Sequence, residues 1–260
     1  MHARRLAAPW IVLPYALFLV LPLVALVWRA DGESLARGLT DAAVWSAVGV
    51  SLSTSLFAIG LCLLFGLPLA YGLAHGRVPG RRALDLLLDL ANVMPPAVAG
   101  LALLFAFGRR GLLGPALGEL GITLPFTPAA VVLAQWFVAG PLFVRTAALG
   151  FRSLNPDLFE QAEIDGADRW RIFSAIALPL TAPAILGGLA LAWARALGEF
   201  GATILFAGNL TGVTQTMPLA IYLGLEQDLS LAITLALILL TLAGVALLIA
   251  RLFDRPHSTG

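Results

Sequence analysis

Residues Glu160-Gln-Ala-Glu-Ile-Asp-Gly166, followed by Ile176-Ala-Leu-Pro179, form a charged segment between two long apolar stretches. Because carboxylates are costly to place in hydrocarbon, we expect this segment to lie in water at a membrane surface. Asn155-Pro156-Asp157 predicts a helix start, since Asn caps helices and Pro fits in the first turn. Gly166 predicts the end of that helix, since glycine adopts the positive φ that other residues resist. A second helix, which enters the membrane, is predicted to follow.

Helical spacing predicts which side chains of this segment meet apolar surroundings. Leu158, Phe159, Ala162 and Asp165 follow helical spacing and predict a short amphipathic first helix, and Trp170, Ile172, Phe173 and Ile176 start a second apolar stripe. The acidic residues expected to face water or a partner are Glu160, Glu163, Asp165 and Asp168. A solvated loop with ordinary charges is the simpler interpretation of the same residues.

The composition places the rest of the chain in a membrane. Of 260 residues, 60% are apolar and 12% are charged, and the mean hydropathy is +0.92, whereas soluble domains carry about 25% charged residues. A net charge of +1 gives no reason to expect nucleic acid as a partner. All 16 basic residues are arginine, which excludes a P-loop lysine and a Schiff-base lysine. Cys62 has no disulfide partner, and His2, His75 and His257 are isolated, so no metal site is predicted.

Six apolar stretches are long enough to cross a bilayer, which takes about 20 helical residues. They predict an all-α, polytopic membrane protein that forms a single transmembrane domain over residues 1–260. The predicted spans are 9–28, 46–74, 83–107, 128–150, 179–206 and 229–250, and the charged segment between the fourth and fifth, 151–178, is called the coupling segment below.

The distribution of arginine predicts the orientation, because arginine accumulates on the cytoplasmic side. With the N-terminus inside, ten arginines lie in inner segments: Arg4, Arg5, Arg77, Arg81, Arg82, Arg152, Arg169, Arg171, Arg251 and Arg255. Four lie in outer segments: Arg29, Arg37, Arg109 and Arg110. Both termini and the coupling segment are therefore expected in the cytoplasm.

Glu160, Ala162 and Gly166, with the Ile-Ala-Leu-Pro run that ends at Pro179, resemble the coupling loop of binding-protein-dependent ABC importer permeases. Gln161 departs from the alanine usual in that family. The resemblance implies a type I ABC importer permease (MetI-like) fold whose short helix docks in a groove of a separate ATPase subunit. The residues it assigns to coupling are Glu160, Ala162, Glu163, Asp165, Gly166 and Ala167.

The same resemblance implies the partners. They are a second copy of this chain, two cytoplasmic ABC ATPase subunits, and a periplasmic or extracellular binding protein, around a pathway through the bacterial plasma (inner) membrane. The chain is then a channel-forming subunit and not an enzyme. It binds no cofactor itself, since ATP and Mg²⁺ are used by the partner ATPase.

A second set of runs bears on the substrate. Gly198-Glu-Phe-Gly-Ala-Thr203, with Ala207-Gly-Asn209 and Thr214-Gln-Thr-Met-Pro-Leu-Ala-Ile-Tyr222, resembles the permeases for tetrahedral oxyanions, and most of all the molybdate permease subunit. Asn92-Val-Met-Pro-Pro96 resembles its third span. Molybdate, with tungstate as a further ion, is therefore the expected cargo, loaded by a molybdate-binding protein. Sulfate, another oxyanion and thiamine-like compounds stay open as alternatives.

Polar and helix-breaking residues in the apolar spans are candidates for the pathway or its gate. Arg195 and Glu199 are four residues apart and are expected to pair on one helix; they either line the pathway or join packed helices. Pro95-Pro96 is expected to kink the third span, beside the pathway or within packed helices. The candidates are Arg195, Glu199, Thr203, Asn209, Thr214, Gln215, Pro95 and Pro96.

Three further charged residues lie near the inner ends of the spans. Arg145 is expected to extend toward the interface. Asp85 and Asp89 are one helical turn apart, and either pair with Arg81 or Arg82 or contact the ATPase.

The sequence disfavours two other classes of protein. A secondary transporter is disfavoured because no internal repeat is visible. An intramembrane enzyme is disfavoured because the sequence has no Gly-x-Ser-x-Gly or His-Glu-x-x-His motif and no paired catalytic aspartates.

Overall fold

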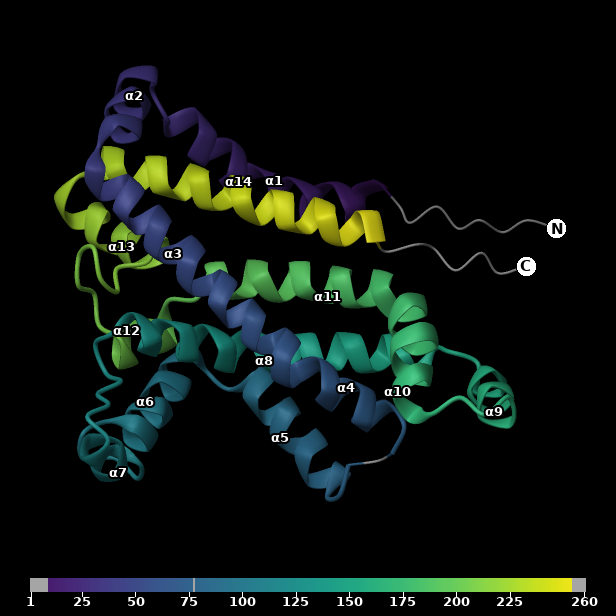
Figure 1. The fold of residues 1–260 in the computed structure, drawn as a ribbon. Coiled ribbons are helices and arrows are strands. Elements are labelled where there is room, and N and C mark those ends of the chain that lie inside the picture. The colour runs from purple at the N-terminus through teal and green to yellow at the C-terminus, as the bar shows by residue number, and fades with distance from the viewer. Residues whose placement is uncertain (1–8, 77, 254–260) are drawn as a thin grey trace.

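The computed structural model describes residues 9–76 and 78–253, and this part of the chain is helical without a strand (Figure 1). Six residues used above lie outside the described ranges: His2, Arg4, Arg5, Arg77, Arg255 and His257. The helices are α1 Pro9–Arg29, α2 Gly32–Thr40, α3 Ala42–Leu61, η1 Cys62–Gly66, α4 Leu67–Ala74, α5 Arg81–Val93, α6 Pro96–Phe107, α7 Gly114–Glu119, α8 Pro128–Arg152, α9 Pro156–Ile164, α10 Arg169–Ile172, η2 Phe173–Ala177, α11 Leu178–Leu197, α12 Gly201–Phe206, α13 Met217–Gln227 and α14 Leu229–Phe253.

Five helices are long and apolar enough to cross a membrane, and a bent pair makes a sixth candidate. They are 12–29 in α1, 42–74, 128–152, 169–197 and 229–253. Two of the five contain a π-helical turn, η1 and η2, and run through it without a break. The fold is therefore all-α with up to six spans, as predicted.

The predicted third span is not one helix. α5 and α6 meet at an angle of 120°, because Pro95 and Pro96 lack the amide protons that continue a helix and Met94 is forced out of the helical region. Met94 has φ −63° and ψ 129°. The expectation of a kinked span over 83–107 is thus corrected: the segment is two helices with a bend of 120° between them, the geometry of a broken span or of a re-entrant loop.

The predicted fifth span is also shorter at its far end. α10, η2 and α11 form one continuous helix over residues 169–197. This helix ends at Leu197 and does not reach residue 206. Gly198 caps it, and α12 follows as a separate short helix. Three segments between the predicted spans also hold helices, α2, α7 and α13. Asp31 starts α2 by accepting a hydrogen bond from the Ser34 amide at 2.8 Å, which lowers the pKa of the Asp31 carboxyl.

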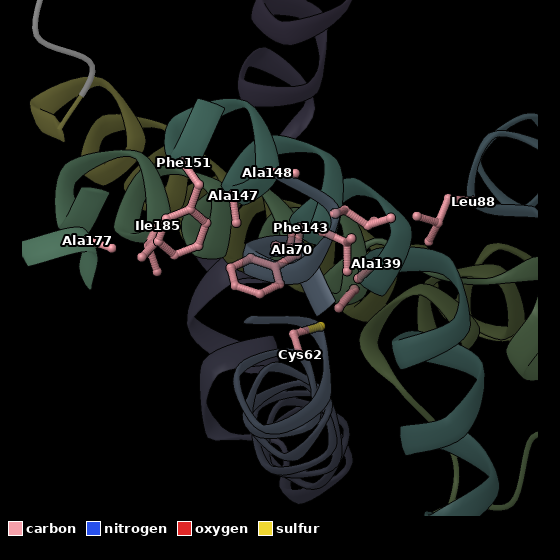
Figure 2. Packing of buried hydrophobic residues seen from close by; sticks show 14 residues of the cluster. Cys62, Ala70, Leu88, Ala139, Phe143, Ala147, Ala148, Phe151, Ala177 and Ile185 are labelled. Atoms are coloured by element: carbon pink, nitrogen blue, oxygen red, sulfur yellow. The ribbon is translucent and has the colours of Figure 1, made fainter. Parts of the chain in front are cut away.

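α8 lies in the middle of the bundle, against α11, α3, α4 and α12 (Figure 1). Figure 2 shows the packing between them, where Phe143, Ala147 and Phe151 of α8 lie among Cys62, Ala70 and Ile185. α14 and α1 lie on one side of this core and α5 and α6 on the other, while α9 lies at the same end as the start of α1 and the end of α14 (Figure 1).

Candidate functional site

The coupling segment begins with a helix whose ends are fixed locally. The Asn155 side chain accepts a hydrogen bond from the Asp157 amide at 3.1 Å, and Pro156 occupies the first position of α9. This arrangement satisfies an amide that the first turn of a helix leaves without a partner. The start predicted from Asn155-Pro156-Asp157 is confirmed.

α9 ends in a Schellman motif. The Gly166 amide donates to the Glu163 carbonyl at 3.1 Å, and the Ala167 amide donates to the Ala162 carbonyl at 2.9 Å. These two bonds need a left-handed residue between them, and Gly166 has φ +81°. Four of the residues assigned to coupling thus form the turn itself, which explains why a glycine stands at this position.

A second cap follows at once. The Asp168 carboxylate accepts from the Arg171 amide at 2.8 Å and starts α10, which continues through η2 and α11. The predicted order of short helix, glycine turn and membrane-entering helix is therefore present. The entering helix starts about ten residues before Pro179, since the segment 169–197 is continuous.

The predicted apolar face of α9 is only partly correct. Ala162 is buried and Phe159 is half-buried, but Leu158 is exposed. The acidic residues Glu160, Glu163, Asp165 and Asp168 are exposed, as expected.

Two large apolar side chains of the segment are exposed, Ile164 and Trp170. The sequence made no prediction for Ile164, and its helical spacing wrongly placed Trp170 in an apolar stripe. Ile164 is 84% exposed and Trp170 is 72% exposed. Ile164 lies in α9 and Trp170 at the start of the 169–197 helix, both among charged residues, so they make a mixed apolar and charged surface of the kind that binds another protein.

The second group of candidates lies where α11 ends. The Glu199 side chain is 1% exposed, pairs with Arg195 Nη1 at 2.9 Å and accepts a hydrogen bond from the Ala202 amide at 2.7 Å. The predicted pairing is confirmed, but Glu199 lies beyond the last residue of α11 and joins that helix to α12. Arg195 keeps 39% of its side chain exposed, so its charge is the accessible one of the pair.

The two helix breaks pack against each other. A Cβ at Gly201 would lie 2.7 Å from the Cβ of Pro96, and a Cβ at Gly100 would lie 2.7 Å from the carbonyl oxygen of Ala202. α6 and α12 therefore approach as closely as glycine allows. We call residues 94–96 and 198–201 the paired breaks; Pro95, Pro96 and Glu199 belong to them. Thr203 follows in α12 and is buried, without a hydrogen-bond partner for its hydroxyl among the described residues.

The other three candidates belong to the turn before α13. The Thr214 hydroxyl accepts from the Leu210 amide at 3.0 Å, and Asn209 Nδ2 donates to the Leu219 carbonyl at 3.5 Å. Gln215 is buried and lines a separate cavity of about 150 Å³ between α3, α13 and α14. No hydrogen bond in the described part of the chain joins these side chains to Arg195 or Glu199, so they shape a turn rather than extend the ion pair.

Arg145 does not extend to the interface as expected. Its guanidinium donates to Asp85 Oδ1 at 2.6 Å and to Asp89 Oδ1 at 2.7 Å, and it also donates to the Asp85 carbonyl at 2.7 Å. Arg81 is 3.6 Å from Asp85, which confirms one of the predicted partners. Two carboxylates one turn apart on α5 stabilise the arginine more than a longer reach to water would, because charge-assisted bonds are strong.

The sequence interpretation also missed Gln135 of α8. This side chain is fully buried, and neither of its amide atoms has a hydrogen-bond partner in the described residues. A glutamine in an apolar span is itself a signal that could have been used. Within the described ranges no group of three His, Cys, Asp or Glu side chains is placed to bind a metal ion.

Comparison with known proteins agrees with this architecture. Residues 62–256 match the family model for the "Binding-protein-dependent transport system inner membrane component". The "Molybdenum transport system permease protein ModB" of Mycobacterium tuberculosis is 39% identical over 95% of this chain and 95% of its own length. ModB of Escherichia coli is 42% identical over 81% and 93%. The sulfate transport system permease protein CysT of Escherichia coli is 38% identical over 81% and 77%.

Two solved structures share the fold. A chain of a bacterial ABC transporter that imports the acidic polysaccharide alginate has a TM-score of 0.64 at 20% identity, over 95% of this chain and 91% of that chain. A chain of the MetNI methionine ABC transporter has a TM-score of 0.59 at 17% identity, over 90% and 99%. The fold is that of type I ABC importer permeases. The chain belongs to the family of inner membrane components of binding-protein-dependent transport systems.

Proposed function

We propose that this chain is the permease subunit of an ATP-driven importer for molybdate, and that tungstate is a second cargo. The observation that carries the transport role is the coupling segment, a capped helix outside the membrane spans with exposed acidic and apolar side chains. The ion is inferred from the relatives named for molybdenum transport, which match over most of the chain. The sequences Gly198–Thr203 and Thr214–Tyr222, which resemble molybdate permeases, support the same assignment of molybdate as the cargo.

The proposed assembly contains two copies of the chain around one pathway. Two ATPase subunits, which bind ATP and Mg²⁺, dock against α9 on the cytoplasmic side, and a molybdate-loaded binding protein docks on the opposite side. Exposed Ile164 and Trp170 supply apolar contact to the ATPase, while Glu160 and Glu163 supply charge. α9 lies at the same end of the molecule as the start of α1 and the end of α14 (Figure 1). If α9 is on the cytoplasmic side, this arrangement supports a cytoplasmic location for both termini.

Arg195 is the proposed contact for the passing anion. A dianion would be repelled by a bare carboxylate, but Glu199 is neutralised by Arg195 and is itself 1% exposed. The exposed part of the guanidinium therefore determines the local charge that an ion meets. A single partly paired arginine binds weakly, which suits transport because the ion must also leave.

Sulfate is the second candidate cargo, since the sulfate permease of Escherichia coli is nearly as similar as the molybdenum permeases. Both ions are tetrahedral dianions, so one arginine does not distinguish them by charge. Selection between them then falls to the binding protein.

The test is cellular molybdenum in a strain that lacks this chain, measured at low external molybdate with and without excess tungstate or sulfate. We expect molybdenum to fall in the mutant, to recover when the chain is restored, and to be competed by tungstate but not by sulfate. Unchanged molybdenum in the mutant would contradict molybdate as cargo, and reduced sulfate uptake in the same strain would identify the second candidate.

A further inference from the structure

We propose that Phe159, His75 and Tyr71 form an aromatic stack that transmits movement of α9 to the membrane-spanning helices. Phe159 is then a positioning residue for transport. The proposal rests on the coupling role proposed above for α9, and it adds the route by which that helix acts on the membrane domain.

The rings form a continuous series from α9 into the bundle. The ring centroids of Phe159 and His75 are 5.0 Å apart at 81°, and those of His75 and Tyr71 are 4.3 Å apart at 44°. Tyr71 then contacts Phe151 of α8 at 5.2 Å and 78° and Phe173 of η2 at 4.9 Å and 67°. Three of these four contacts are edge-to-face, a geometry in which aromatic rings attract one another beyond simple burial.

α9 has few other attachments to the bundle. In the described residues no ion pair involves α9, and its side-chain hydrogen bonds are local to its first turn. Its backbone packs most closely on α10, which follows it across the glycine turn. Phe159 is half-buried and packs against the same buried cluster as Tyr71. A push on α9 is therefore passed to the bundle through this ring, through the buried Ala162 and through the chain at the two ends of the helix.

The middle ring of the stack is held at the end of α4. His75 Nδ1 lies 2.9 Å from the Tyr71 carbonyl oxygen, and since a carbonyl only accepts, the tautomer with the proton on Nδ1 makes this contact a hydrogen bond. Tyr71 stands five residues after η1, and Phe173 is the first residue of η2. The stack thus reaches both spans that contain a π-helical turn, an irregularity that recurs at functional sites.

The experiment uses the assembled transporter in proteoliposomes, with its ATPase subunits and binding protein, and counts molybdate ions imported per ATP hydrolysed. We expect Phe159→Ala to lower this ratio about fivefold, the scale of one lost aromatic contact, while the ATPase subunits still copurify. Phe159→Tyr keeps the ring and is expected to keep the ratio near that of the unaltered protein. Ile164→Ala, an exposed side chain on the same helix, is expected to weaken ATPase copurification instead.

A ratio that stays unchanged in both Phe159→Ala and His75→Ala would overturn the stack, while the coupling role of α9 would stand. If Phe159→Ala does not assemble, His75→Ala decides alone, because it removes the neighbouring ring from α4 and leaves α9 intact. Absence of ATP-driven molybdate uptake by the unaltered transporter would overturn the proposed function, and the stack with it.

Discussion

The coupling segment connects two membrane helices, and the paired breaks separate α5 from α6 and α11 from α12. The two regions are stabilised by different kinds of contact. Around α9 the backbone bonds join residues no more than five positions apart, from the Asn155 cap to the Ala167 amide. At the paired breaks the deciding contacts join Pro96 to Gly201, more than 100 residues apart in the chain. Local bonding leaves α9 exposed for a partner, whereas long-range packing places a buried carboxylate beside a helix end.

The sharpest test of this comparison is Gly166→Pro. Proline fixes φ near −65°, cannot adopt the observed +81° and removes the amide that donates to Glu163. The expected cost at the turn is about 3 kcal/mol or more, so ATP-driven uptake should fall by about 100-fold while the subunit still inserts. Gly118→Ala is the matched control, since a Cβ there meets no neighbouring atom. Normal uptake by Gly166→Pro would mean that the turn does not couple.

Removal of either partner of the buried ion pair should have unequal effects. Arg195→Gln leaves the carboxylate of Glu199 buried without a cation, and we expect a loss of about 3 kcal/mol in the free energy of unfolding. Glu199→Gln should lose about 1 kcal/mol, because Arg195 is partly exposed and the glutamine oxygen can still accept from the Ala202 amide. Thermal unfolding of the purified subunit in detergent measures both. Equal losses would show that burial of Glu199 does not govern the pair.

The close approach of the breaks is tested by Gly201→Ala. The new Cβ would lie 2.7 Å from Pro96, and overpacking of this kind costs about 2 kcal/mol. Gly198→Ala serves as control three residues away, because its Cβ would lie 3.6 Å from the Ala194 carbonyl oxygen, an ordinary contact. Comparison of the two melting temperatures tests the packing, and a control as unstable as Gly201→Ala would assign the effect to lost backbone freedom instead.

The smallest effect is expected at the Arg145 cluster. Asp85 is 26% exposed and meets both Arg145 and Arg81, whereas Asp89 is 63% exposed and meets Arg145 alone. Asp85→Asn should lower the free energy of unfolding by about 1 kcal/mol and Asp89→Asn by about 0.3 kcal/mol. Both losses should shrink in high salt. A larger loss from Asp89→Asn would mean that exposure does not rank these pairs.

The coupling segment could be predicted because its bonds are local. An Asn-Pro start and a glycine at the end each specify a cap at a fixed spacing. Asp168 supplies a third local cap, which the sequence interpretation did not use. The same short-range reasoning could not predict which apolar side chains of the coupling segment are buried. Leu158 and Ile164 of α9 and Trp170 of α10 are exposed because the fold places no neighbouring element over them.

By itself the sequence determined that the protein is a helical membrane protein, where most of its spans lie, and the form of the short helix and turn in the coupling segment. These follow from composition, the length of apolar runs and caps made within a few residues. The sequence indicated an interruption at Pro95-Pro96, but only the structure gave the size of the bend, 120°. Only the tertiary structure decided that Arg145 binds two aspartates of α5 and that Gly201 lies on Pro96. Such contacts join residues far apart in the chain, so the spacing of neighbouring residues carries no record of them.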